Sequence, residues 1–263
     1  MLRSMYSGIS GMKNFQTKLD VIGNNISNVN TYGFKKGRVV FKDLVSQSIA
    51  GANGPANGRG GVNPKQVGLG SQIAAIDTIQ TEGSTQTTGR TLDLAVSGDG
   101  FFQVTDGVNT YYTRAGNFYM DDEGSIVNSD GLYLVGEGAN ITVPTTATSL
   151  SIGAGGVISF IDGGQLDATQ VVQLAKFPNS GGVIKVGENL YQQSDNSGDP
   201  VTSVPGDQDA GMGRIVAGAL EMSNVDLSEE FTEMIVAQRG FQANTRIITT
   251  SDEILQELMS MKR

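Results

Sequence analysis

The chain ends with the stretch DLSEEFTEMIVAQRGFQANTRIITTSDEILQELMSMKR, residues 226–263, whose apolar residues recur every seven positions. One column of this repeat is wholly apolar: Leu227, Met234, Phe241, Ile248 and Leu255. The other column is polar in its middle: Phe231, Gln238, Thr245, Asp252 and Met259. The pattern predicts one helix, and Asp226 and Glu229 have the capping-box spacing that begins one. At about 1.5 Å per residue the helix would be on the order of 50 Å long, and such a helix needs a partner along its length.

The beginning of the chain, residues 1–30, repeats this design. Its apolar residues recur at three-four spacing: Leu2, Met5, Ile9, Met12, Leu19, Ile22, Ile26 and Val29. Gly8, Gly11 and Gly23 each weaken a helix by about 1 kcal/mol relative to Ala, so this helix needs packing to form. An ordinary N-terminal amphipathic helix is the simpler interpretation. We instead expect the two terminal helices to pair and to bury their remaining apolar stripes against other copies of the chain.

The middle of the chain predicts β structure, so the fold class is α+β. Residues 1–30 and 225–263 would form a discontinuous helical core domain, 31–72 an extended connecting arm, and 73–224 an all-β domain rich in Gly. Turns are predicted at the Asp-Gly pairs that begin at Asp106, Asp130 and Asp162. The predicted strands are 92–96, 111–113, 118–120, 125–127, 132–135, 141–143, 157–161, 171–175 and 214–220.

Composition excludes most catalytic chemistry. The 263 residues include no Cys and no His, which removes disulfides, thiol nucleophiles, imidazole metal ligands and the Ser-His triad. The net charge of −9 argues against nucleic acid or an anionic membrane as the main partner. Residues 121–124 read as a hairpin turn rather than a calcium loop, and 153–156 lack the following helix of a phosphate site. We therefore expect no enzyme activity, cofactor, metal or small-molecule substrate.

A resemblance to a known family is carried first by residues 20–35, DVIGNNISNVNTYGFK. This stretch resembles the signature near the N-terminus of bacterial flagellar rod and hook proteins. Further family motifs are TGRTLDLAV (88–96), GDGFF (98–102), YTRAGNF (112–118), EMSNVD (221–226) and QRGFQ (238–242). The resemblance implies a structural subunit that is exported unfolded through the flagellar type III apparatus and stacked into a tube. Its partners would be copies of itself, other axial proteins of the rod and the hook–filament junction, and the hook cap.

The position within the flagellum has two candidate answers. TYGFK (31–35), VGLG (67–70) and TGR (88–90) look more like the hook subunit, whereas the short length and the spacing from Phe41 to Phe101 look like the distal rod. We favour a compact hook, with the distal rod as the alternative and an assembly cap or scaffold as a third class. The expected location is the hook and basal body, outside the cell, after export without a cleaved signal peptide.

The assembly model also predicts which residues contact other subunits. Asn24, Asn25 and Asn28 either close the first helix toward Gly33 or form an amide ladder that bonds the neighbouring subunit's backbone. The polar column of the last helix would face the tube's channel or a polar subunit contact. The full set of predicted interface residues is Leu2, Met5, Ile9, Met12, Leu19, Ile22, Asn24, Asn25, Ile26, Asn28, Gly33, Phe34, Phe231, Met234, Ile235, Phe241, Ile248, Ile254 and Leu255.

Overall fold

The computed structural model describes residues 2–54 and 60–261 and divides into two compact units. The helical unit contains residues 1–27, 37–78 and 226–263, and the β unit contains 28–36 and 79–225. Two long helices and a strand-rich middle confirm the predicted α+β class. Neither described helix is long and apolar enough to cross a membrane.

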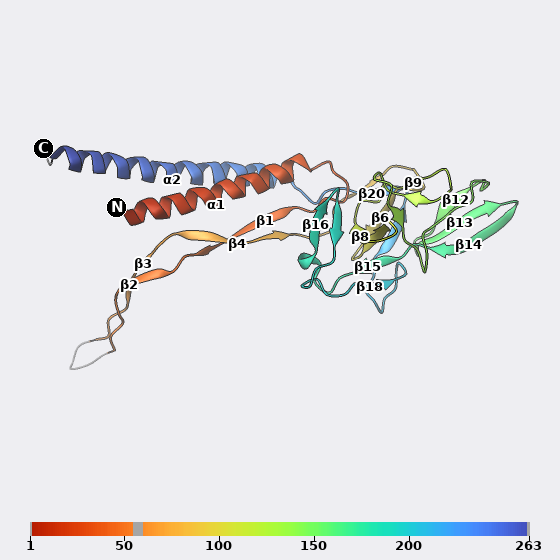
Figure 1. The fold of residues 1–263 in the computed structure, drawn as a ribbon, viewed down its shortest axis with the longest axis horizontal. Coiled ribbons are helices and arrows are strands. Elements are labelled where there is room, and N and C mark those ends of the chain that lie inside the picture. The colour runs from red at the N-terminus through yellow and green to blue at the C-terminus, as the bar shows by residue number, and fades with distance from the viewer. Residues whose placement is uncertain (1, 55–59, 262–263) are drawn as a thin grey trace. The chain divides into compact units, whose positions relative to one another are not determined.

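The helical unit holds both predicted terminal helices, α1 (Leu2–Ser27) and α2 (Leu227–Met261) (Figure 1). Asp226 caps α2 as predicted, because its Oδ1 accepts hydrogen bonds from the backbone N–H of Ser228 at 2.8 Å and of Glu229 at 3.4 Å. The observed helices end within a few residues of the predicted bounds. Local apolar periodicity and the cap therefore suffice to place both elements.

The predicted connecting arm is a two-stranded ribbon in the same unit. β1 (Gly37–Asp43) pairs antiparallel with β4 (Ser71–Thr78), and β2 (Ser46–Ala50) pairs antiparallel with β3 (Lys65–Gly68). Figure 1 shows the β2–β3 pair following the β1–β4 pair along the ribbon. Residues 37–78 therefore group with the helices, whereas the prediction placed 73–78 in the β domain.

The β unit is built on a nine-stranded antiparallel sheet with the order β16-β17-β8-β7-β11-β10-β9, to which β15 and β18 are added through β7. Three smaller sheets, β12-β13-β14, β19-β6 and β20-β5, complete the described strands of the unit. The bounds are β5 Thr85–Thr87, β6 Leu94–Ser97, β7 Phe101–Thr105, β8 Thr110–Thr113, β9 Tyr119–Met120, β10 Ile126–Val127, β11 Tyr133–Leu134, β12 Leu150–Ile152, β13 Val157–Asp162, β14 Gln165–Val171, β15 Leu174–Lys176, η1 Ser180–Gly182, β16 Ile184–Gly187, β17 Leu190–Gln192, β18 Val201–Ser203, β19 Arg214–Ala217 and β20 Ala219–Glu221.

The predicted Asp-Gly turns connect strands of this unit. Gly107 joins β7 to β8 with φ 90°, and Gly163 joins β13 to β14 with φ 56°, a region that glycine enters without steric cost. Asp121 and Gly124 close the β9–β10 turn through a backbone hydrogen bond of 2.9 Å. Within residues 2–54 and 60–261, no group of three or more acidic side chains is placed to hold a metal ion.

Two clusters of buried side chains form the core of the β unit. The larger includes Leu94, Phe102, Phe118 and Leu134, and the smaller joins Phe101, Tyr112, Phe177 and Tyr191 through edge-on aromatic contacts. The segment 141–143 was predicted as a strand. Its Ile141 and Val143 are buried, but the segment makes only an isolated β-bridge through Thr142. Its three amides bond to three different places: Leu134 of β11, the Gln170 side chain and the Gly124 carbonyl.

Candidate assembly surface

The two helices pair antiparallel, and close contacts follow the pair from one end to the other. Gly8 lies against Ile248, and Gly11 lies against the amide of Asn244. Further along, Lys18 forms an ion pair of 3.0 Å with Glu233, and the Asn25 amide donates to Glu230 Oε2 at 3.1 Å. The predicted partner of the last helix is therefore the first helix.

Small residues at the crossing let the two backbones approach. A Cβ added at Gly11 would lie 2.9 Å from the Asn244 side chain, and one added at Gly240 would lie 2.6 Å from the Phe15 ring. A Cβ at Gly23, in contrast, would meet no described atom within 4 Å. Close packing between the helices therefore explains why glycine occupies positions 11 and 240. No contact among the described residues explains glycine at position 23.

The ribbon packs against α1 through polar and aromatic contacts. Asn14 donates to Ser71 Oγ at 2.8 Å, and the rings of Phe15 and Phe41 lie 6.1 Å apart. Asn25 accepts from the Gly37 N–H and donates to the Gly37 carbonyl, both at 2.9 Å. Asn25 therefore holds β1 and α2 to the end of α1.

This arrangement corrects the amide-ladder hypothesis for Asn25. The side chain is only 2% exposed, and its oxygen and nitrogen are already bonded within the helical unit, so it offers no amide to another subunit. Ile22 is likewise buried. Burial of both residues argues against a direct subunit contact.

Apart from Gly33 and Phe34, the other predicted interface residues differ in exposure. The apolar columns of α1 and α2 have partly buried side chains: Met5, Met12, Leu19, Ile26, Met234, Phe241, Ile248 and Leu255. The exposed group is Ile9, Asn24, Phe231, Ile235 and Ile254, and Asn28 is partly buried in the β unit. The side chain of Leu2, the first residue of α1, lies outside the described residues. Subunit contacts by these residues stay a prediction.

Helix α2 keeps two apolar stripes that the helical unit does not cover. At 3.6 residues per turn, one face carries Val236, Ile247, Ile254, Leu258 and Met261. A second face is apolar only at its ends, with Leu227, Phe231 and Ile235 near the start of the helix and Met259 near its end, and it carries the polar column between them. All nine side chains are at least 40% exposed, and they flank the stripe that packs on α1. Exposed apolar surface of this kind is typical of protein contact sites.

The polar column lies on the exposed side as well. Gln238 and Asp252 are exposed, and Asp252 accepts from the Gln256 amide one turn on at 3.0 Å. Thr245 is partly buried and returns its hydroxyl to the Phe241 carbonyl at 3.0 Å. None of the three side chains therefore enters a dry core within the subunit. That the column faces the tube's channel or a polar subunit contact stays a prediction.

The last part of the flagellar signature, residues 28–35, lies in the β unit, where the sequence did not place it, and its Gly33, Phe34 and Lys35 are buried. Gly33 has φ 69°, and a Cβ there would lie 2.5 Å from the Ala115 backbone nitrogen. Its N–H donates to the Glu221 carbonyl at 2.9 Å. Phe34 is also buried, with Lys185 Nζ 5.0 Å from its ring centroid. Gly33 and Phe34 therefore organise the subunit rather than present a surface, which corrects their assignment as interface residues.

The next residue of the signature, Lys35, belongs to a buried ion triad. Its Nζ donates to Glu221 Oε1 at 2.5 Å and to the Thr81 carbonyl at 2.8 Å. Arg114 donates to Glu221 Oε2 at 3.3 Å and to the Gly98 carbonyl at 2.8 Å. Burial lowers the pKa of Lys35, although Glu221 opposes this shift. The triad ties residues 28–36 to the β unit and explains why they group with it.

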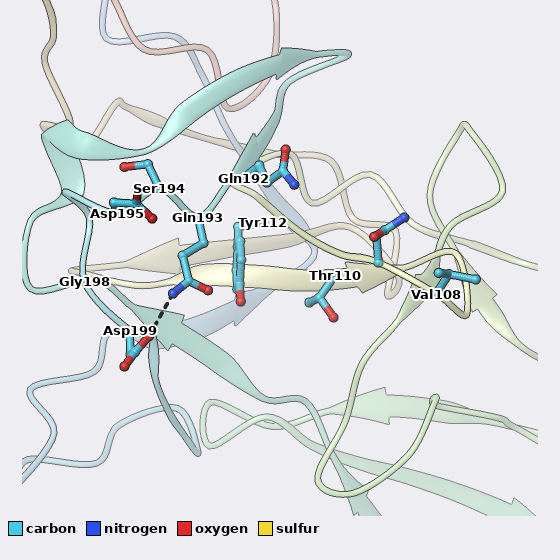
Figure 2. Close-up of a pocket in the computed structure, with 10 residues that line it drawn as sticks. Val108, Thr110, Tyr112, Gln192, Gln193, Ser194, Asp195, Gly198 and Asp199 are labelled. Atoms are coloured by element: carbon cyan, nitrogen blue, oxygen red, sulfur yellow. Dashed lines mark hydrogen bonds between the residues drawn. The ribbon is translucent and has the colours of Figure 1, made fainter.

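A cavity of about 740 Å³ in the β unit is lined by polar side chains (Figure 2). Tyr112 and Thr110 of β8 line the cavity, and the Gln193 amide donates a hydrogen bond to Asp199 Oδ1 at 2.9 Å. Burial raises the pKa of the Tyr112 hydroxyl, which makes it a poorer proton donor. No nucleophile with a neighbouring base lies among the described lining residues. The cavity therefore carries no recognisable catalytic arrangement.

Three family models match parts of the chain. "Flagella basal body rod protein" matches residues 5–35, "Flagellar hook protein FlgE/F/G D1 domain" matches residues 95–160, and "Flagellar basal body rod FlgEFG protein C-terminal" matches residues 216–261. The first and last of these cover most of α1 and α2, and the second covers the middle of the β unit.

Individual relatives separate rod from hook. The chain is 58% identical over 266 residues, and over all of both chains, to the flagellar basal-body rod protein FlgG of Bacillus subtilis. It is 38% identical to the FlgG of Agrobacterium fabrum over 96% of this chain and 97% of the relative. It is 31% identical to the flagellar hook protein FlgE of Borreliella burgdorferi, in a full-length alignment that runs to 443 positions.

The alignment lengths and identities favour the distal-rod alternative over the hook that the sequence analysis preferred. The hook alignment has far more positions than the 263 residues of this chain, so that protein carries segments with no counterpart here. The rod alignment has almost none. The hook-like motifs TYGFK, VGLG and TGR therefore did not discriminate between the two. On these matches, the chain belongs to the bacterial flagellar rod and hook protein family.

Proposed function

We propose that this protein is a distal-rod subunit of the flagellar basal body, a structural protein without enzyme activity. The observation that carries the proposal is the full-length match to the Bacillus subtilis rod protein, 58% identical over 266 residues against 263 in this chain. A rod must transmit torque stiffly, whereas a hook must bend. Because this chain and the Bacillus subtilis rod protein have nearly the same length and align almost without gaps, the match supports the same mechanical role for both.

Assembly would proceed through the helical unit. The two exposed stripes of α2 are uncovered within the described residues and would contact a different face of the next copy. Such a contact forms an open helical polymer when its rotation does not close into a ring. Repetition of such a contact builds a helical tube. The exposed ribbon, with Val45, Ile49 and Val67 on its surface, would add contacts between copies.

The partners and location follow from the same proposal. Copies of this chain would contact one another and the adjoining rod and hook subunits in the basal body. The unfolded chain would pass through the type III export apparatus without a cleaved signal peptide, and a cap would guide its addition at the growing end. A contact with the hook–filament junction would be expected only of a hook subunit.

Electron microscopy of basal bodies purified from a deletion strain tests the proposal. We expect the deletion to stop assembly before the distal rod is complete, and complementation with the wild-type chain to restore rod and hook together. Basal bodies with a complete rod that lack only the hook would contradict the rod assignment and support the hook. Gold-labelled antibody against the β unit should bind the rod segment of complemented particles.

A further inference from the structure

A second cavity, of about 140 Å³, lies in the β unit beside the buried ion triad. Among its lining residues are Gln80, Asp99, Phe101, Arg114, Lys176 and Ser180. It is separate from the exposed stripes of α2 and plays no part in the assembly described above. Its volume suits a few water molecules or one small ion and is too small for a sugar or a nucleotide.

Two side chains that line this cavity, the buried Arg114 and the partly buried Gln80, have buried polar atoms without a hydrogen-bond partner among the described residues. Arg114 is 4% exposed, and its Nε is buried and unpaired while its other guanidinium nitrogens bond to Glu221, Val96 and Gly98. Both polar atoms of the Gln80 amide are also buried and have no partner within hydrogen-bond distance, although the amide is near enough to the Tyr191 hydroxyl to lower its pKa against the effect of burial. Buried donors without acceptors are costly, so Arg114 Nε–H and the Gln80 N–H call for an acceptor in the cavity.

The local charge balance specifies the kind of acceptor. The triad contains two cations, Lys35 and Arg114, but one carboxylate, Glu221, and all three are almost fully buried. The Asp99 carboxylate does not supply the missing charge, because it pairs with Lys176 at 3.3 Å. The Glu82 carboxylate also acts on Lys35, but Glu82 is exposed, so the buried groups alone keep a surplus positive charge, which favours a bound anion.

The geometry points to a binding site for one small carboxylate-type oxyanion, held by Arg114 Nε–H and the Gln80 amide N–H. The hydroxyl of Ser180 lies on the cavity wall as a further donor. Aromatic rings of Phe101 and Phe177 form part of the wall and lower the dielectric around the ion, which strengthens both charge-assisted hydrogen bonds. The ion is either free in solution or the carboxylate of an Asp or Glu of a second copy.

Thermal unfolding of the full-length chain, kept below its polymerisation concentration, tests this site. Sodium formate is exchanged for sodium chloride at constant ionic strength, and the melting of the β unit is followed by near-ultraviolet circular dichroism of its tyrosines. Because an anion that binds only the folded state stabilises it by mass action, Tm should rise with the logarithm of the formate concentration. Equal Tm values in formate and chloride would overturn the proposal and leave water as the only occupant.

Two variants separate this site from a general salt effect. Gln80→Leu removes one proposed ligand and should abolish the formate-dependent rise in Tm. Gln103→Leu is the matched control, because Gln103 is also a buried amide with an unpaired Nε2 but lies on β7 and does not line the cavity. Retention of the formate effect in Gln80→Leu, or its loss in Gln103→Leu, would contradict the assignment.

Nuclear magnetic resonance gives a second measurement that does not depend on stability. The Nε–H resonance of Arg114 should shift as formate is added to the monomer and should stay fixed in chloride. If the natural occupant is a carboxylate of a second copy, the polymer should no longer take up formate. If it is a free anion, polymer and monomer should bind formate alike.

Discussion

Gly240 of α2 lies against the ring of Phe15 of α1, so closely that an added Cβ would come within 2.6 Å of the ring edge. The ring cannot retreat freely, because its other side faces Phe41 of the ribbon at a centroid distance of 6.1 Å. This one relationship couples three parts of the helical unit. Glycine in the middle of a helix lowers helix stability, but the close packing against the Phe15 ring leaves no space for a side chain at position 240.

Gly240→Ala should therefore destabilise the helix pair, although Ala is the better helix former. Overpacking of the Phe15 ring costs about 1–3 kcal/mol, which exceeds the helix-propensity gain of about 1 kcal/mol. Gly23→Ala is the control, since a Cβ there meets nothing within 4 Å and the same gain is realised. Thermal melts of the monomer at 222 nm should show the first variant below wild type and the second above it. Equal gains in both variants would show that the helices do not pack as described.

A second glycine prediction concerns the flagellar signature. Gly33→Ala should severely destabilise the β unit, because φ is 69° and the new Cβ would lie 2.5 Å from the Ala115 nitrogen. Gly131→Ala also places Ala at positive φ, 81°, but its Cβ meets nothing within 4 Å, so it should cost only about 1 kcal/mol. Urea unfolding of both variants measures the difference. A similar loss in the two would leave only backbone strain as the cause.

The buried triad gives a third prediction. Glu221→Gln removes the carboxylate that pairs with Lys35 and Arg114 and should cost about 3–5 kcal/mol in the free energy of unfolding of the β unit. Asp77→Asn breaks the ion pair with Arg38. Because the Arg38 side chain is 62% exposed and the Asp77 side chain is 45% exposed, this change should cost less than about 1 kcal/mol in the free energy of unfolding. Comparable losses in urea titrations would mean that the triad is hydrated rather than buried.

Alkaline pH should destabilise the β unit through Tyr191. Burial raises the pKa of Tyr191 from 10.0 to about 12, so the unfolded chain loses this proton first. The stabilisation is complete below pH 10 and is lost as pH rises from about 10 to 12, a change of roughly 2–3 kcal/mol. Tyr191→Phe cannot ionise and should lose less stability over this range. Lys35 and Lys185 have pKa values lowered by burial and act in the opposite direction, so the difference between wild type and Tyr191→Phe isolates the effect.

Local signals in the sequence predicted both helices, the cap at Asp226 and the Asp-Gly turns, because each depends on residues a few positions apart. The β2–β3 ribbon was expected only as an arm, since its exposed strands carry no regular alternation of buried and exposed residues. The role of Lys35 could not be predicted, because its partner Glu221 stands 186 positions away and only the fold brings them together. For the same reason Asn25 was assigned to the subunit surface, although its side-chain amide forms hydrogen bonds with Glu230 and Gly37.

The central claim is that copies of this chain polymerise through the uncovered stripes of α2. The most direct test follows polymer formation by light scattering and electron microscopy for Ile254→Glu, a charge placed on the stripe, beside Gln242→Glu, which adds the same charge to the same helix at an exposed polar position outside that stripe. Both variants should remain folded monomers by circular dichroism. We predict that Ile254→Glu fails to form tubes and that Gln242→Glu forms them as the wild type does. Tubes formed equally well by Ile254→Glu would contradict the account.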